Sequence, residues 1–158
     1  MKKEYIIPIF VPHLGCPNQC TFCNQKKISG QLKKVTAKDV EETIEYYLKN
    51  FKDKNKYVEV AFFGGSFTAI DVKEQEELLS VAHKYIENKK VNSIRISTRP
   101  DYINKEILKR LSKNGLLIGI DRDEDALKAA KENLKEFENV KFVKDNHDNI
   151  KQILEDIG

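Results

Sequence analysis

The chain has 158 residues, of which 40% are hydrophobic and 34% charged, and its formal net charge is +3. This length and apolar content suffice for one ordinary hydrophobic core, which excludes a disordered tail. No stretch approaches the roughly 20 apolar residues of a membrane span, and the start, MKKEYIIPIF, has no small-residue cleavage site, so we expect a cytoplasmic protein without a membrane partner. Lysines alternate with acids, which is typical of solvated helix faces.

The apolar periodicity alternates along the chain between strand and helix patterns. The first predicted strand is Tyr5–Val11, and Pro8 within it favours an edge position because proline donates no backbone hydrogen bond. A helix follows behind Thr36, a suitable N-cap. The apolar face of this helix comprises Val40, Ile44, Tyr47, Leu48 and Phe51. The next predicted strand is Tyr57–Phe63.

The rest of the chain continues this alternation. Asp71 is predicted to cap the second helix, with Glu74 at the spacing of a capping box. The apolar stripe of that helix comprises Leu78, Leu79, Ala82 and Ile86. The remaining predicted strands are Ser93–Thr98, Leu116–Ile120 and Val140–Val143. The remaining predicted helices carry the apolar residues Ile107, Leu108 and Leu111 before Gly115, then Ala126, Leu127, Ala130 and Leu134, and finally Ile150, Ile153, Leu154 and Ile157.

Five β–α units in strict alternation predict an α/β fold with a parallel sheet and right-handed crossovers. If each crossover leads to the adjacent strand, the strand order is 1-2-3-4-5 and the sheet curls into a partial (βα) barrel. We therefore expect residues 1–158 to form a single α/β domain. The strand face inside the unfinished curl would be uncovered, so self-association is expected.

Polar and glycine residues follow each predicted strand, and ligands of such sheets sit at the carboxyl ends of the strands. After the first strand come Cys16, Cys20 and Cys23, and the later strand ends carry Gly64-Gly65-Ser66-Phe67-Thr68, Thr98-Arg99-Pro100-Asp101, Asp121-Arg122-Asp123 and Asp145-Asn146-His147-Asp148. One edge of the sheet is therefore predicted to carry the chemistry.

The three cysteines are the only ones in the chain and have the spacing C-x3-C-x2-C. In a reducing compartment an odd, clustered set indicates metal or redox chemistry rather than disulfides. Three thiolates can hold three irons of a [4Fe–4S] cluster and leave the fourth open to another ligand. Alternatively, Cys16, Cys20, Cys23 and His13 form a suitable Cys3His set for zinc.

The stretch PHLGCPNQCTFCNQ, together with AFFGGSFT and ISTRPDYI, resembles the radical S-adenosylmethionine (radical SAM) superfamily, in the branch related to the elongator catalytic subunit. The resemblance covers about residues 4–112. It implies a [4Fe–4S] cluster on Cys16, Cys20 and Cys23 with SAM bound to the open iron. One electron from the cluster would cleave SAM, and the resulting 5′-deoxyadenosyl radical would abstract hydrogen from a substrate. A reductant such as a flavodoxin or ferredoxin is then the expected partner, and the branch suggests an RNA substrate.

The same resemblance assigns contacts to residues at two strand ends. Gly64, Gly65 and Ser66 occupy the place of the superfamily's Gly-Gly-Glu motif, where backbone groups meet the SAM amino group. Glycine suits a backbone that approaches a ligand closely, whereas Ser66 in place of the acid leaves no carboxylate there. Thr98 and Arg99, with Asp101, would orient SAM or substrate, although Arg99 and Asp101 also suit a surface ion pair. No catalytic residue is identified.

The tail resembles a different enzyme, the Rossmann-like small-subunit ribosomal RNA cytosine methyltransferase, over about residues 105–158. LIGIDRDEDAL matches its second strand and following helix, which implies that Asp121 binds the ribose hydroxyls of SAM. VKFVKDNHDNI matches its third strand, with Asn146 in the expected place. An equally good interpretation is that Asp121 and Asp123 cap the following helix.

The chain therefore resembles a hybrid, with a radical SAM-like part at 1–112 and a methyltransferase-like β–α–β–α part at 113–158, and neither parent is complete. The favoured function is a truncated radical SAM enzyme. A non-catalytic remnant that keeps an iron–sulfur cluster or zinc is the first alternative. A fragment of a SAM-dependent ribosomal RNA cytosine methyltransferase is the second.

Overall fold

A computed structural model describes residues 3–12, 34–98, 103–112, 117–121, 123–133, 135 and 139–144. The chain divides into two compact units, Met1–Tyr102 and Ile103–Gly158, and each is considered by itself. Within the described ranges, no helix combines the length and the apolar character that crossing a membrane requires.

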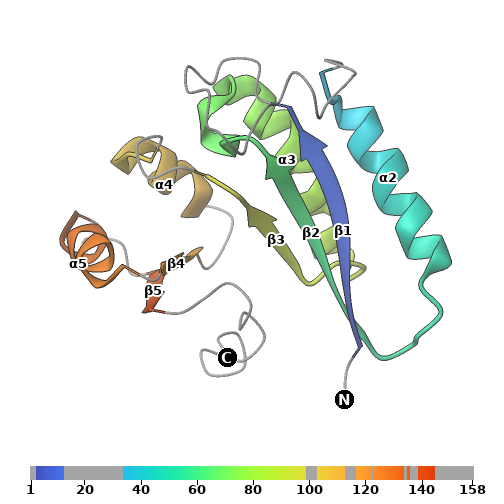
Figure 1. Cartoon of the computed structure of the whole chain (residues 1–158). Helices are drawn as coiled ribbons and strands as arrows, with labels where there is room; N and C mark the ends of the chain where they lie inside the picture. The colour runs from blue at the N-terminus through green and yellow to red at the C-terminus, as the bar shows by residue number, and fades with distance from the viewer. Residues whose placement is uncertain are drawn as a thin grey trace, which may run out of the picture. The chain divides into compact units, whose positions relative to one another are not determined.

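The first unit contains a three-stranded parallel sheet in the order β1-β2-β3 (Figure 1). Its elements in chain order are β1 (Lys3–Val11), α2 (Ala37–Asn50), β2 (Lys56–Gly64), the 3-10 turn η1 (Phe67–Ala69), α3 (Val72–Glu87) and β3 (Ser93–Ile96). β1 pairs with β2 along its whole length, from Lys3 opposite Lys56 to Val11 opposite Gly64. The edge position predicted from Pro8 is confirmed, because β1 is an outer strand of this sheet.

Helices α2 and α3 cover one face of this sheet (Figure 1). Alternate residues of each strand point to opposite faces, so Ile7, Val60 and Phe62 face the helices and their neighbours do not. The shared core consists of Ile7, Ile9, Val11, Val58, Val60 and Phe62 from the strands, Val40 and Ile44 from α2, and Leu78, Val81, Ala82 and Tyr85 from α3. The apolar stripes predicted for the two helices thus face the sheet.

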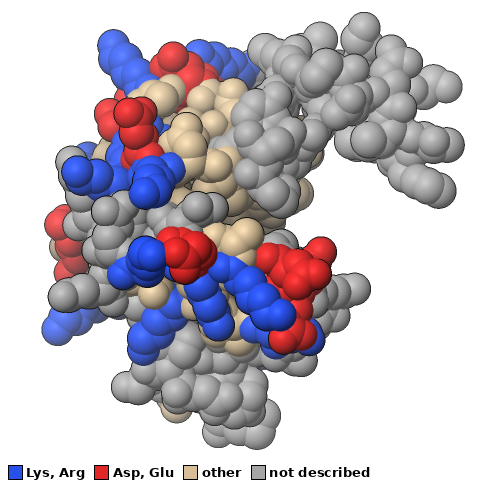
Figure 2. Space-filling view, turned by 90° about the vertical axis from the view of Figure 1, so that its left-hand side faces the viewer, with Lys and Arg blue, Asp and Glu red and all other residues tan. Residues whose placement is uncertain are grey.

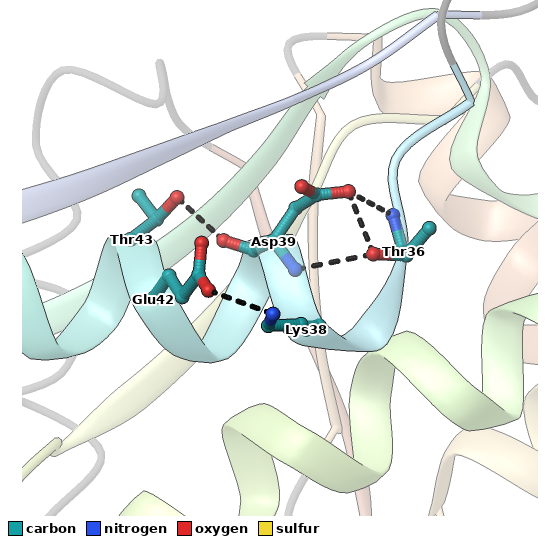
Figure 3. Close-up of polar contacts among 5 residues, drawn as sticks. All are labelled: Thr36, Lys38, Asp39, Glu42 and Thr43. Atoms are coloured by element: carbon teal, nitrogen blue, oxygen red, sulfur yellow. Dashed lines mark hydrogen bonds and ion pairs between the residues drawn. The ribbon is translucent and has the colours of Figure 1, made fainter.

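The N-terminus of α2 is fixed by a capping box around Thr36 (Figure 3). The Asp39 backbone N–H donates to Thr36 Oγ1 at 3.2 Å, and the Asp39 carboxylate accepts from the Thr36 backbone N–H at 2.8 Å and from its hydroxyl at 2.7 Å. Two backbone donors that the helix itself cannot satisfy are therefore paired. The N-cap predicted at Thr36 is confirmed, and Asp39 adds the reciprocal half.

The cap predicted at Asp71 is also present. Its carboxylate accepts from the backbone N–H groups of Lys73 at 2.9 Å and Glu74 at 3.4 Å. The Glu74 carboxylate lies 2.9 Å from Lys34 Nζ instead of completing a described capping box. This ion pair ties the start of α3 to the segment that leads into α2.

The second unit contains α4 (Lys105–Ser112), β4 (Leu117–Asp121), α5 (Glu124–Asn133) and β5 (Val140–Lys144). β4 and β5 form a parallel pair. The helix starts carry caps, because Asn104 Oδ1 accepts from the Ile107 N–H and Asp123 Oδ1 accepts from the Asp125 N–H, both at 2.9 Å. The helix-capping interpretation of Asp123 is thus confirmed.

The predicted α/β fold, with parallel strands alternating with helices, is confirmed. Within the described residues the strand pairs form one ladder of three strands and one of two. The order 1-2-3-4-5 in one curled sheet, the partial barrel and the single domain therefore stay predictions. The helix predicted around Ile150–Ile157 lies outside the described residues.

Candidate functional site

The end of β2 lies directly beside the end of β1, because Gly64 pairs with Val11. Gly64 has a φ of +117°, a conformation that residues with a side chain rarely adopt. A Cβ there would lie 2.7 and 2.9 Å from atoms of the Phe10 ring and 2.9 Å from the Val11 carbonyl oxygen. The backbone conformation and the packing against β1 therefore both require glycine at this strand end.

The loop after β2 is anchored to β3 and α3. Phe67 is buried against Phe62, with ring centroids 5.1 Å apart, and its backbone N–H donates to the Ser97 carbonyl at 2.9 Å. The Gln75 amide, 1% exposed, donates to the carbonyls of Thr68 at 3.2 Å and Ile70 at 2.8 Å. Buried backbone acceptors need such partners, so these hydrogen bonds attach the loop to α3 and to the end of β3.

This anchoring brings three hydroxyl groups together. Ser66 Oγ lies 3.0 Å from Thr98 Oγ1, and the hydroxyls of Thr68 and Thr98 also form a hydrogen bond. Ser66 and Thr68 are buried, whereas Thr98 is half-buried. The structure thus joins two predicted site residues from different strand ends, Ser66 after β2 and Thr98 after β3. Hydroxyl groups both donate and accept hydrogen bonds, so the cluster can pair with either kind of ligand atom.

Several predicted site residues lie outside the described residues. Cys16, Cys20 and Cys23 belong to this set, as do His13, Arg99, Asp101 and Asn146. Asp121 ends β4, but its side chain is not among those described. In the part of the chain that the structure describes, no group of three His, Cys, Asp or Glu side chains could hold a metal ion. The cysteine ligands and the contacts of Arg99 and Asp121 therefore stay predictions.

An ion pair between a buried carboxylate, Glu59, and a half-buried Arg95 lies on the sheet face opposite α2 and α3 and was not predicted from the sequence. The Glu59 side chain is 6% exposed, and its Oε1 lies 2.5 Å from Arg95 Nη2, while Ser93 donates to its Oε2 at 3.0 Å. Burial also raises the pKa of Tyr57 at the start of the same strand. The signal was available: Glu59 interrupts the apolar run VEVAFF at a position that points away from the helices.

The same face also carries exposed apolar side chains. Ile6 is 50% exposed, Phe10 41% and Phe63 40%, and the two phenylalanine rings meet edge to face with centroids 5.8 Å apart. Exposed and buried side chains lie side by side on this face, because Ile6 is opposite Glu59 in the β1–β2 register while Glu59 and Ala61 are buried. That this strand face is left uncovered, and that the chain self-associates through it, stays a prediction.

Charged side chains of both signs are mixed over the surface. Figure 2 shows Lys and Arg alternating with Asp and Glu, with no extended area of one sign among the described residues on the face drawn. Most ion pairs among the described residues, such as Lys38–Glu42 at 3.5 Å, are largely exposed and add little to stability. This view therefore gives no basic stripe of the kind that nucleic-acid-binding proteins carry.

Comparison with known proteins gives two findings. A family model described as the radical SAM superfamily matches residues 10–156. In addition, 54 residues are 59% identical to ribosomal RNA small subunit methyltransferase H of Clostridium botulinum strain Hall, which is 34% of this chain and 18% of that protein. The same enzyme of strain Okra is 57% identical over the same length.

The chain thus spans less than a fifth of the length of the curated relatives it matches. The matched length equals that of segment 105–158, to which sequence analysis assigned the methyltransferase resemblance. The family model, in contrast, runs through almost the whole chain and includes the three cysteines and the ends of all five described strands. On this evidence the chain belongs to the radical SAM superfamily.

Proposed function

We propose that the chain binds a [4Fe–4S] cluster through Cys16, Cys20 and Cys23 and binds SAM at the open iron, as an enzyme of the branch related to the elongator catalytic subunit. The observation that carries the proposal is the family match over residues 10–156, which contains all three cysteines. The donor set fits the group, because three thiolates satisfy three irons and leave one coordination position for a ligand. When bound, the cluster would supply the electron for cleavage of the SAM sulfonium, and a flavodoxin or ferredoxin would be its reductant.

The described strand ends support the proposal. Val11, five residues before Cys16, pairs with Gly64, so the backbone that enters the cysteine segment starts beside the glycine pair of β2. Gly65 follows with no side chain, which allows a ligand to approach the backbone closely. The Ser66–Thr68–Thr98 hydroxyl cluster lies on the same strand ends and would orient polar groups of SAM or substrate. We assign these residues to binding and orientation, not to proton transfer.

Calorimetric titration with SAM tests the assignment of the binding site. Chelation by iron is the strongest expected contact, whereas Asp121 offers a pair of charge-assisted hydrogen bonds of about 1.5–3 kcal/mol each. Cluster-free protein should therefore bind SAM barely at all, and Asp121→Ala should weaken binding to the loaded protein by roughly tenfold. If cluster-free protein binds SAM well and Asp121→Ala abolishes that binding, the functional site is in the methyltransferase-like part.

The second candidate is a fragment of a SAM-dependent ribosomal RNA methyltransferase. The 59% identity to ribosomal RNA small subunit methyltransferase H over 54 residues favours it. It ranks below the first because the match covers 18% of that protein. Under this candidate RNA is the substrate class, and Asp121 at the end of β4 contacts the SAM ribose without any cluster. A non-catalytic remnant that keeps a cluster or zinc but binds no SAM would leave the titration flat in both forms.

A further inference from the structure

A cavity of about 440 Å³ opens at the edge of the three-stranded sheet where β2 and β3 begin. This is the end of the sheet opposite the arrowheads in Figure 1, away from the Gly64 strand end. The last turns of α2, the segment that enters β2 and the turn between α3 and β3 form its lining. Five of the lining residues are lysines: Lys49, Lys54, Lys56, Lys89 and Lys90.

The lining of this cavity has more lysines than acidic residues, so it carries a net positive charge. One of the described lining residues is acidic: Glu45, whose carboxylate lies 3.7 Å from Lys90 Nζ. Lys56 Nζ donates to the Phe51 carbonyl at 3.2 Å. Lys49, Lys54 and Lys89 have no ion pair or side-chain hydrogen bond within the described part of the chain, and these three ammonium groups can pair with an anion.

Asn92 adds a neutral donor with a fixed orientation. Its Oδ1 accepts from the Val58 backbone N–H at 2.8 Å, and its own backbone N–H donates to the Val58 carbonyl at 2.8 Å. Because the amide oxygen is held by β2, the amide NH2 group points away from that bond. The cavity therefore combines one neutral donor with its lysines, and both kinds of group can donate to an oxyanion.

Lys89 occupies an unusual backbone position at the rim of this cavity. It follows Asn88, the C-cap of α3, with a φ of 56° in the left-handed region. Glycine is the usual residue just after a helix end, because a Cβ is disfavoured in that conformation. A lysine at this position has an unfavourable backbone conformation, and its charged side chain lies at the cavity.

We propose that this cavity binds a compact polyphosphate group, such as the di- or triphosphate of a small molecule. The cavity is open to solvent and its lysines Lys49, Lys54, Lys89 and Lys90 are exposed, so a charged ligand can reach them from solution. Its described lining contains no aromatic residue, and the nearby rings of Phe51 and Tyr85 have Lys56 and Lys90 over them at 5.8 and 5.7 Å. Single-stranded nucleic acids use open aromatic faces for base stacking, so a phosphate-rich small anion fits better than RNA.

Titration of the full chain with sodium tripolyphosphate, and with pyrophosphate, tests this proposal. We expect saturable binding that weakens as salt is raised. Lys49→Gln with Lys54→Gln should weaken it by about tenfold. Glu45→Gln should tighten it by roughly threefold, because the repelling charge is lost while the glutamine oxygen still accepts the Tyr85 hydroxyl, now bound at 2.8 Å.

Matched controls separate a specific site from bulk charge. Lys73→Gln with Lys84→Gln removes the same charge from exposed positions outside the cavity and should leave binding unchanged. Lys89→Gly should weaken binding while it raises the thermal midpoint, because glycine relieves the left-handed position.

Four results would overturn the proposal. The first is no saturable binding by the unmodified chain, and the second is an equal loss in the control pair. The third is binding of a mixed-sequence single-stranded RNA that tripolyphosphate does not displace, which would mark a nucleic-acid surface instead. A loss of thermal stability in the Lys49 and Lys54 variant with unchanged tripolyphosphate affinity would also contradict it, because the lysines would then only offset the helix C-terminal carbonyls.

Discussion

Gly64→Ala should destabilise the first unit strongly, independently of any ligand. The φ of +117° is unfavourable for alanine, at a cost of about 1–2 kcal/mol. The added Cβ would lie 2.7 Å from the Phe10 ring and 2.9 Å from the Val11 carbonyl oxygen, and overpacking of this kind costs about 1–3 kcal/mol. The Phe10 ring is partly exposed and can move, but the carbonyl belongs to the paired strand. We expect a total loss of roughly 2–5 kcal/mol.

Urea denaturation followed by circular dichroism measures this loss. Gly119→Ala is the matched control, because its Cβ would also approach a ring, that of Phe142 at 2.9 and 3.0 Å, but without a positive φ. A flexible ring can shift, so this control should lose no more than about 1.5 kcal/mol. Equal unfolding free energies for the Gly64→Ala variant and the unmodified chain would refute the argument. A Gly64→Ala variant that lost activity would then have lost it through SAM contact and not through folding.

Three further predictions concern the first unit. Thr36→Ala removes the capping box of α2 and should cost about 1 kcal/mol in the unfolding free energy measured with urea, and a loss below a few tenths would contradict the role of the cap. Hydrogen bonds from Tyr5, then from Lys3, hold the pKa of Asp53 below its ordinary 3.8. Its stabilising effect is therefore present above that value and is lost as the pH falls through the lower folded pKa, so Asp53→Asn should flatten the acid limb of a stability–pH profile. Arg95→Met leaves the Glu59 carboxylate buried without a counter-charge and should cost about 3 kcal/mol, most of which Glu59→Gln in the same chain should restore; a double variant no better than the single would contradict this.

Helix starts and the position of one edge strand were predicted correctly, because they depend on contacts between residues close in the sequence. Thr36, Asp71 and Asp123 are N-caps in the structure, and Pro8 lies in an outer strand. In each case the side chain bonds to, or limits, backbone within a few residues of itself. Strand bounds differ by one or two residues, as for β3, which ends at Ile96 rather than Thr98, because pairing with β2 and not composition decides where a ladder ends.

Tertiary features were harder to predict. Gln75 lies on the otherwise apolar face of α3 that includes Leu78. The sequence alone does not show that its amide donates hydrogen bonds to carbonyls of the preceding loop. Glu59 could be recognised as unusual in an apolar strand, but its partner, Arg95, comes from another strand and depends on the register. The hydroxyl contact between Ser66 and Thr98 was anticipated only as a shared sheet edge.

Anaerobic reconstitution with iron and sulfide tests the central claim most directly. We expect about four irons and a broad charge-transfer absorption for each chain. Changing Cys16, Cys20 or Cys23 singly to Ala should abolish that absorption, because each thiolate would hold one iron. Stoichiometric zinc, bound with no uptake of iron, would contradict the cluster and favour the Cys3His zinc site that includes His13.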